Sequence, residues 1–174
     1  MFNRRIAIGG RPGVGKSTVV ERVLDALPAT AGGMLTKEIR KCGYRVGFSV
    51  IDIATAETGT LAHLHQRTGP RVGKYRVNLD DLERIGVAAI RSALSQKNLV
   101  IVDEIAPMEL CSPAFVEAIE ETLRAKDVNL LFTTHFRTSH PLAYRVRQEF
   151  IRFRVTLSNR ETIAKEILAT LEEG

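Results

Sequence analysis

The sequence lacks tryptophan and long apolar runs, and it contains only two cysteines. Cys42 and Cys111 stand far apart and lack the spacing of metal ligands, so we expect free thiols rather than a disulfide framework. No segment approaches the roughly 18 apolar residues that indicate a membrane-spanning helix. Residues 1–5 lead straight into a short apolar segment without a signal-peptide pattern. These absences favour a cytoplasmic protein with no membrane partner.

The sequence also lacks a concentrated basic patch. Its 25 Lys and Arg residues exceed its 20 Asp and Glu residues, which gives a net charge of +5, but they are spread along the chain without interleaved aromatic residues. Such a surplus suits the binding of polyanions, including nucleoside triphosphates. It is too modest to indicate nucleic-acid binding, which stays a secondary hypothesis.

The composition indicates one globular domain. Hydrophobic residues make up 44% and charged residues 26% of the 174 residues, which is typical of a soluble protein. The length suffices for one full core and is too short for two ordinary domains. We expect a single domain over residues 1–174, working as a monomer.

The most informative stretch is residues 10–18, which fit the phosphate-binding pattern G-x-x-x-x-G-K-[ST]. An apolar segment precedes it, and apolar residues at helical spacing follow it, so strand, loop and helix come in the required order. Lys16 is expected to reach the β- and γ-phosphates, and the Ser17 hydroxyl to bind Mg²⁺. The alternative is a glycine-rich turn with an exposed lysine. The predicted nucleotide-binding residues are Gly10, Arg11, Pro12, Gly13, Val14, Gly15, Lys16, Ser17 and Thr18.

A second polar cluster follows the continuously apolar residues 99–102, which are typical of a strand buried on both faces. Asp103 is expected to hold Mg²⁺ through a bound water, and Glu104 to take a proton from the attacking water. The alternative is an acidic pair that ends a strand in solvent. Lys16 and Glu104 are therefore the predicted catalytic residues, and Ser17 and Asp103 the predicted metal ligands.

The remaining pattern predicts an α/β fold in three layers, with a mostly parallel sheet between helices. Alternation over residues 44–53, after a strand-like segment at 34–40, predicts an added β-hairpin. Residues 57–74 are polar and without clear periodicity, so we expect a flexible or ligand-responsive segment there. Alternation also predicts a strand over residues 153–157.

Helix starts are marked by capping residues. Ser112 followed by Pro113 predicts an N-cap and a first helical position. Asn159 is the expected N-cap of the last helix.

Two further positions, Thr134 and Arg40, are weaker candidates. Thr134 ends a strand, where it would orient the water or contact the γ-phosphate, or merely satisfy a backbone group. Arg40 would act as an arginine finger from the same chain, or pair weakly with Glu38 on the same face. His135 and His140 have no metal-ligand spacing and are expected in exposed loops.

Several segments together resemble the small nucleoside-triphosphatase family of the THEP type, also called cancer-related nucleoside-triphosphatases. The most specific is Asp-Glu-Ile-x-Pro-Met-Glu-Leu at residues 103–110, and the resemblance extends over nearly the whole chain. The other segments are residues 10–18, 38–40, 72–75 and 155–160.

The resemblance implies a P-loop NTPase with a RecA-like sheet. It implies slow, Mg²⁺-dependent hydrolysis of several nucleoside triphosphates to diphosphate and phosphate, and suggests that Asn159 and Arg160 contact base or ribose. Ala106 replaces the family's usual glycine, and Thr134-His135 replaces a common Ile-Pro or Val-Pro. Neither departure changes the four residues predicted to bind phosphate, metal and water.

Three functions are therefore weighed. The first is hydrolysis of ATP, GTP, CTP and UTP with Mg²⁺ as cofactor. The second is a nucleotide or small-molecule kinase, for which the basic residues Arg67, Arg71 and Lys74 would form an acceptor lid. The third is an ATPase switch coupled to nucleic acid. Phosphate release without an acceptor separates the first from the second, and stimulation by polynucleotide would favour the third.

Overall fold

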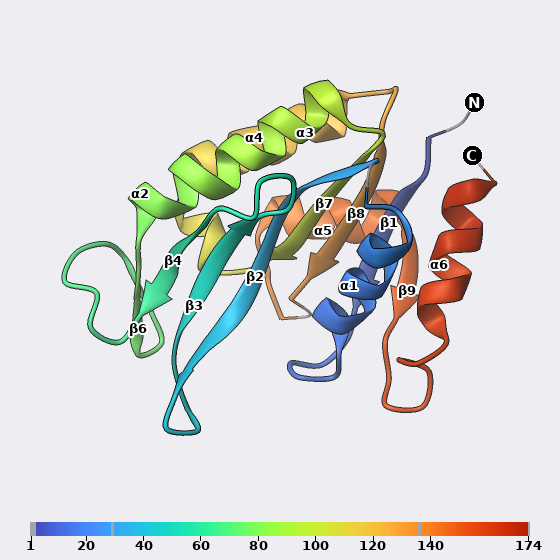
Figure 1. The fold of residues 1–174 in the computed structure, drawn as a ribbon. Helices are drawn as coiled ribbons and strands as arrows, with labels where there is room; N and C mark the ends of the chain where they lie inside the picture. Colours follow the sequence, from blue (N-terminus) through green and yellow to red (C-terminus); the bar gives the residue numbers. More distant parts are fainter. Residues whose placement is uncertain (1–2, 29, 136, 174) are drawn as a thin grey trace.

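The structure is a computed structural model that describes residues 3–28, 30–135 and 137–173. The ends of the expected domain, residues 1–2 and 174, lie outside the described residues, and Figure 1 shows the fold of the others. The strands are β1 (Arg5–Gly9), β2 (Ala31–Lys41), β3 (Tyr44–Asp52), β4 (Thr58–His63), β5 (Arg71–Val72), β6 (Tyr75–Val77), β7 (Leu99–Ile105), β8 (Asn129–Thr134) and β9 (Ile151–Arg154). The helical segments are α1 (Lys16–Ala26), α2 (Leu79–Asp81), η1 (Leu82–Val87), α3 (Ala88–Gln96), η2 (Glu109–Cys111), α4 (Pro113–Arg124), α5 (Pro141–Glu149) and α6 (Ile163–Glu172).

The strands of the described residues form one sheet in the order β5-β6-β4-β3-β2-β7-β8-β1-β9. From β2 to β9 the neighbours are parallel, and from β2 to β5 they are antiparallel. The predicted hairpin is confirmed as β2–β3, and three more strands extend the sheet beyond it. The expectation of a flexible segment is wrong for residues 58–63, because β4 pairs with β3 there. Its strand state comes from that pairing rather than from a pattern of its own.

The parallel strands are buried on both faces, as continuous apolar runs require. Along β7, Leu99 and Ile101 pack with α1 and α6, whereas Val100 and Val102 pack with α3 and α4. In Figure 1, α1 and α6 lie on one side of the sheet and α3, α4 and α5 on the other. The predicted three-layer arrangement is confirmed.

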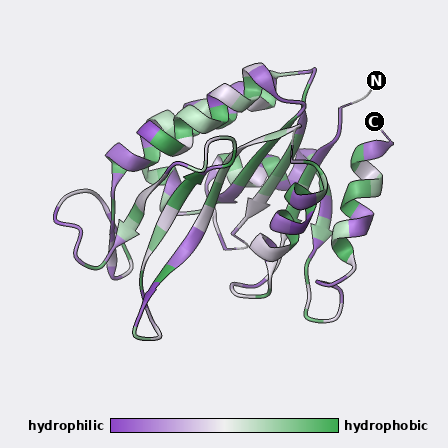
Figure 2. Cartoon of the chain, in the orientation of Figure 1, coloured by the Kyte–Doolittle hydropathy of each residue, from purple (hydrophilic) through white to green (hydrophobic). Residues whose placement is uncertain are grey.

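Hydropathy separates the two halves of the sheet. Figure 2 shows hydrophobic residues along the central parallel strands and hydrophilic residues toward the hairpin end of β2. Along β2 the burial changes from buried at Ala31 to exposed at Lys41. The polar half of β2 is therefore available to a ligand.

Strand β2 approaches β7 closely because of one glycine. Gly33 has a φ of 113°, and a Cβ there would lie 2.0 Å from the carbonyl oxygen of Ile101. A side chain would force the two strands apart. Gly33 thus lets β2 run beside β7, the strand that carries the acidic pair.

Local predictions near the helix starts are borne out in part. Ser112 accepts a hydrogen bond from the backbone N–H of Phe115, with Pro113 in the first turn of α4, as predicted. By contrast, β9 ends at Arg154, and α6 begins at Ile163, later than a cap at Asn159 implies. Asn159 instead accepts from the N–H of Thr156 and closes the turn between the two elements. Within the described ranges, no helix combines the length and apolarity needed to cross a bilayer.

Candidate active site

The loop between β1 and α1 is built by glycines in conformations that other residues rarely adopt. Gly13 has a φ of 73°, and Gly15, the residue before α1, a φ of 112°. Gly10 lies so close to the chain that a Cβ there would be 2.9 Å from the carbonyl oxygen of Val155. Gly15 offers no capping side chain, and the first turn of α1 holds no acidic residue. The helix N-terminus therefore presents its backbone donors and positive dipole end to the loop.

Lys16 is the first residue of α1 and folds back over the loop. Its side chain is largely buried, and its Nζ donates to the carbonyl oxygens of Gly10 at 3.3 Å and Arg11 at 3.4 Å. Both bonds are long for a charged donor. They hold the ammonium at the loop, where phosphate oxygens can replace the carbonyls.

Asp103 lies near the end of β7 and is 1% exposed. Its Oδ1 accepts a hydrogen bond from the Thr133 hydroxyl, whereas its Oδ2 is buried without a hydrogen-bond partner among the described residues. Burial raises the pKa of this carboxyl, and the side chains of Thr133 and Ser17 and the charge of Lys16 act against that rise. The carboxyl therefore faces the phosphate loop with one oxygen unsatisfied.

Glu104, the next residue, is half-buried and lines the cavity described below. Burial raises its pKa to about 7; the Lys16 ammonium lowers the pKa, and the Asp103 carboxylate raises it. A carboxyl whose pKa lies near neutrality is suited to accept and return a proton. The predicted meeting of the phosphate loop and the acidic pair is thus present in the structure.

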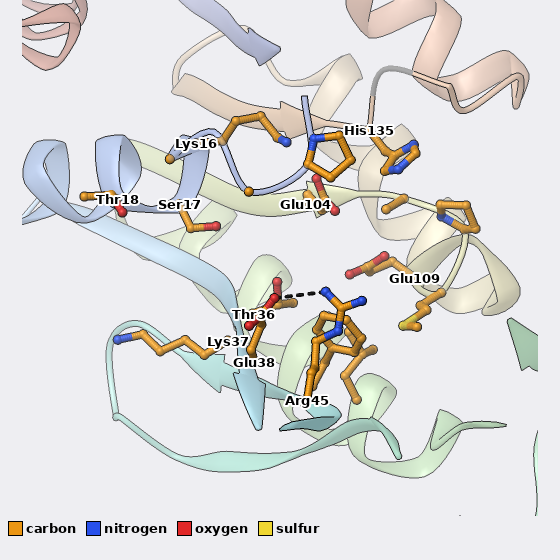
Figure 3. Close-up of a pocket in the computed structure, with 18 of the residues that line it drawn as sticks. Lys16, Ser17, Thr18, Thr36, Lys37, Glu38, Arg45, Glu104, Glu109 and His135 are labelled. Carbon is orange, nitrogen blue, oxygen red and sulfur yellow. Dashed lines mark hydrogen bonds and ion pairs between the residues drawn. The ribbon is translucent and has the colours of Figure 1, made fainter. Parts of the chain in front are cut away.

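One cavity of about 900 Å³ joins the phosphate loop and Glu104, at the upper end of the range for ligand pockets, and Asp103 is not among the described residues that line it. The phosphate loop forms one wall, with Lys16, Ser17 and Thr18 pointing toward it, and Glu104 faces them (Figure 3). Of the predicted nucleotide-binding residues, Pro12, Gly13 and Gly15 also line it, whereas Gly10, Arg11 and Val14 are absent from the lining formed by described residues.

The opposite wall comes from the β2–β3 hairpin. Glu38 bonds two guanidinium groups, accepting from Arg40 Nε at 2.9 Å and from Arg45 Nη1 at 3.0 Å; the second pair is marked in Figure 3. The hydrogen bond from Arg45 is the main reason that the pKa of Glu38 lies below its usual value. Arg40 thus lines the cavity, and it is paired with Glu38, as the alternative interpretation held.

Three weaker candidates lie elsewhere. Thr134 is buried opposite Ile105 in the sheet, and the neighbouring Thr133 makes the contact with the acidic pair. Asn159 is engaged in its turn, donating to the carbonyl oxygen of Arg154 at 2.9 Å. Arg160 packs beside the loop, where its Cδ would lie 3.5 Å from a Cβ at Gly15. None of the three belongs to the cavity lining formed by the described residues.

Sequence reasoning missed several polar residues that line the cavity, among them Glu109 and His135. Glu109 lies in η2, and His135 follows β8. His135 is half-buried, so the expectation of an exposed histidine is wrong for this residue. Burial lowers its pKa, as do the charges of Lys16 and Arg137. Glu109 follows Glu104 by five residues, and no periodicity in the sequence indicates that η2 returns it to the cavity.

A parallel strand, a glycine loop that leads into the next helix, and an acidic pair at the end of a parallel strand of the same sheet, here β7 with β8 between it and β1, define the P-loop class of nucleotide-binding proteins. Comparisons with known proteins narrow this class. The model of the NTPase family matches residues 5–168, and the chain belongs to that family.

Proteins similar to this chain match it over nearly its full length. The chain is 50% identical over 167 residues to the nucleoside-triphosphatase THEP1 of Methanosarcina acetivorans, covering 94% of each chain. Its structure is similar to that of THEP1 from Aquifex aeolicus, with a TM-score of 0.86 and 31% identity over 96% of this chain and 98% of that one. It is also similar to a human cancer-related nucleoside triphosphatase, with a TM-score of 0.82, 29% identity and 98% coverage of both. The predicted family resemblance is confirmed.

Proposed function

We propose that the protein hydrolyses nucleoside triphosphates to diphosphate and phosphate in a Mg²⁺-dependent reaction. The observation that carries the proposal is the shared cavity, in which Lys16 and Ser17 face Glu104. Membership of the NTPase family supports the same activity. We infer that residues 1–174 act as one domain and that the protein is a cytoplasmic monomer.

The donor set fits Mg²⁺, which prefers hard oxygen ligands and keeps several waters. Asp103 offers a buried oxygen without a hydrogen-bond partner among the described residues, and the Ser17 side chain lies close enough to affect its pKa. Ser17 would hold the ion directly and Asp103 through a bound water. When bound, the ion would neutralise charge on the phosphate oxygens.

The chain's own residues have separate tasks in this proposal. Backbone N–H groups of the phosphate loop and the Lys16 ammonium hold the β- and γ-phosphates. Glu104 orients a water and takes its proton as the oxygen of that water bonds to the γ-phosphorus. The bond from that phosphorus to the bridging oxygen breaks, and the diphosphate leaves.

We expect broad specificity for the base, because the proposed contacts are with the triphosphate. The cavity residues that carry the proposal meet the triphosphate, which ATP, GTP, CTP and UTP share. Arg160 lies beside Gly15, so we propose that it contacts the nucleotide from outside the loop, with Asn159 holding the turn that carries it. Arg40 is proposed as an arginine finger, and Thr134 as a support for the strand end.

The deciding experiment is a phosphate-release assay with each of the four triphosphates, with and without Mg²⁺ and without any acceptor. We expect release with all four and none in excess EDTA. A rate unaffected by removing Mg²⁺ would contradict the metal assignment. No release with any triphosphate would contradict the hydrolase.

A further inference from the structure

The cavity lining extends beyond the phosphate loop and Glu104 to residues of β3, β4, β5 and η2. In Figure 3, Glu104 is drawn between Lys16 and Glu109, and Arg45 lies on the other side of Glu109. The charges support this order, since the charge of Lys16 affects the pKa of Glu104, and that of Glu104 affects the pKa of Glu109. We call the space beyond Glu104 the inner chamber. To this part of the cavity we assign six of the residues that line it: Arg45, Phe48, Leu61, Val72, Met108 and Glu109.

Glu109 is the unusual member of this set. It is 2% exposed, and its Oε2 has no hydrogen-bond partner among the described residues. Backbone N–H groups of Glu109 and Ala106 bond the carboxyl, yet burial and the charge of Glu104 still raise its pKa well above the usual value. A buried polar atom without a partner is rare in folded proteins. Because Glu109 lines the cavity, a ligand group is the natural partner of Oε2.

Several other charged residues of the cavity have partners or a task in the proposed function. Lys37 pairs with Glu21 at 2.7 Å, and Arg45 pairs with Glu38. Lys16 is committed to phosphate in the proposed function. Glu109 is therefore a carboxyl that neither the ion pairs nor the triphosphate would satisfy.

The walls of the inner chamber restrict what can meet this carboxyl. The Phe48 ring packs edge-on against Tyr75 with centroids 5.3 Å apart, and the Arg45 guanidinium lies 5.1 Å from the Phe48 centroid. Aromatic rings and guanidinium planes are surfaces on which flat heterocycles stack. A hydroxyl group can donate to Glu109 when it is ionised and accept from it when it is protonated. A nucleoside combines a flat heterocyclic base, which can stack on the ring, with ribose hydroxyl groups, which can bond the carboxyl.

We propose that the inner chamber binds a nucleoside as a second substrate, with a ribose hydroxyl against Glu109 and the base against Phe48, and that this hydroxyl accepts the γ-phosphoryl group. The inference rests on the proposed triphosphate site, which supplies the donor. Glu109 positions the acceptor, whereas Glu104 receives the proton.

The reaction balances with the groups at hand. The hydroxyl oxygen forms a bond to the γ-phosphorus while the bond from that phosphorus to the β,γ-bridging oxygen breaks. The hydroxyl proton passes to the Glu104 carboxylate, and the bridging oxygen leaves as the terminal oxygen of the diphosphate. The products are a nucleoside monophosphate and a nucleoside diphosphate, and water is the competing nucleophile.

The test uses the full chain with γ-³²P-labelled ATP and Mg²⁺, with adenosine, guanosine, cytidine or uridine added in turn. Chromatography separates labelled nucleoside monophosphate from labelled phosphate. We expect labelled monophosphate with at least one nucleoside, and a matching fall in phosphate release. Absence of labelled monophosphate with all four overturns the inference. Failure of the proposed hydrolase is distinct, because phosphate release would then be absent without any nucleoside.

Two variants locate the site. Glu109→Leu removes the hydroxyl contact and Phe48→Ala removes the stacking surface, so each should lower nucleoside phosphorylation at least about tenfold, and more than it lowers phosphate release. The matched controls are Glu166→Leu and Tyr144→Ala, on exposed helix positions. Circular dichroism checks that each variant folds. If Glu109→Leu does not fold, the result with Phe48→Ala alone tests the assignment to the inner chamber. Equal losses of the two products in the folded variants would overturn the assignment to the inner chamber.

Discussion

Thr133 donates its hydroxyl hydrogen bond to Oδ1 of Asp103, across the paired strands β8 and β7. Both residues are buried, and the bond leaves Oδ2 of Asp103 as the oxygen without a hydrogen-bond partner in the described part of the chain. A carboxylate fixed through one oxygen presents the other in a defined direction. Thr133 therefore orients the proposed metal ligand, and such supporting bonds commonly matter for metal affinity.

Thr133→Val should weaken Mg²⁺ binding roughly 10- to 100-fold, because Asp103 loses the bond that orients it. It should also lower the free energy of unfolding by about 1–3 kcal/mol, since a buried carboxyl oxygen is left without a partner. The Mg²⁺ concentration that gives half-maximal phosphate release measures the first effect. Thr133→Ser keeps the hydroxyl and serves as control. An unchanged Mg²⁺ dependence in Thr133→Val would remove Thr133 from this role.

Glu104→Gln should lower the rate of phosphate release by roughly 10²- to 10⁴-fold, since the amide cannot take the proton of water. Nucleotide binding should stay close to that of the unmodified chain, because the phosphate loop is untouched. Equilibrium titration with a non-hydrolysable ATP analogue measures binding, and single-turnover release measures chemistry. Unchanged turnover in this variant would exclude Glu104 as the base.

Glu109→Gln should stabilise the ligand-free protein at high pH. Burial raises the pKa of Glu109 above its ordinary value of 4.5, so the folded state holds this proton longer than the unfolded state. The stability of the unmodified protein therefore falls as pH rises above that value, while the neutral amide escapes the loss. Each 1 kcal/mol corresponds to roughly 2–4 °C in Tm for a chain of this size.

Thermal unfolding in EDTA across pH measures this effect. The Tm difference between Glu109→Gln and the unmodified protein should be larger at about pH 8 than at about pH 5. Glu166→Gln, at an exposed position, provides the control for loss of a charge. A Tm difference that does not vary with pH would show that Glu109 titrates normally.

The phosphate loop and the acidic pair were predictable because their signals are local. Glycines at fixed positions dictate the loop backbone, and a continuous apolar run predicts the buried strand that ends in Asp103. Strand β4 was not predictable in this way, because Gly59 and its polar neighbours carry no alternation. Strand β4 forms because it pairs with β3, and this pairing cannot be read from the residue pattern of either segment.

Strand alternation alone could have indicated Thr133, rather than Thr134, as the residue that contacts Asp103. Side chains two apart on a strand share a face, so Thr133 lies on the side of Leu131, and Asp103 on the side of Ile101. Both apolar residues pack toward α1, the helix that follows the phosphate loop. Glu109 offered no comparable periodicity, since its position depends on how η2 turns back toward β7. Such tertiary placement is beyond a local pattern.

Arg40→Ala tests the proposed arginine finger. A guanidinium that stabilises the transferring phosphoryl group is worth about 10³- to 10⁵-fold in rate, so we expect a loss of at least about tenfold with nucleotide affinity retained. In the ligand-free state Arg40 is 59% exposed at the side chain and paired with Glu38, which would have to release it. Arg152→Ala, on the exposed edge strand β9, is the control. A rate equal to that of the control would assign Arg40 to the ion pair alone.

Lys16→Ala should abolish both nucleotide binding and phosphate release. The Lys16 ammonium is held over the loop by two carbonyl oxygens, and exchanging them for phosphate oxygens is the proposed source of affinity. Lys16→Arg keeps the charge but carries a planar group that the same small loop does not fit, so binding should fall while the protein stays folded. Titration with the non-hydrolysable analogue measures both variants. Normal binding by Lys16→Ala would contradict the assignment of this loop to phosphate. It would also contradict the role of Glu104, which is proposed to activate a water against the phosphate held there.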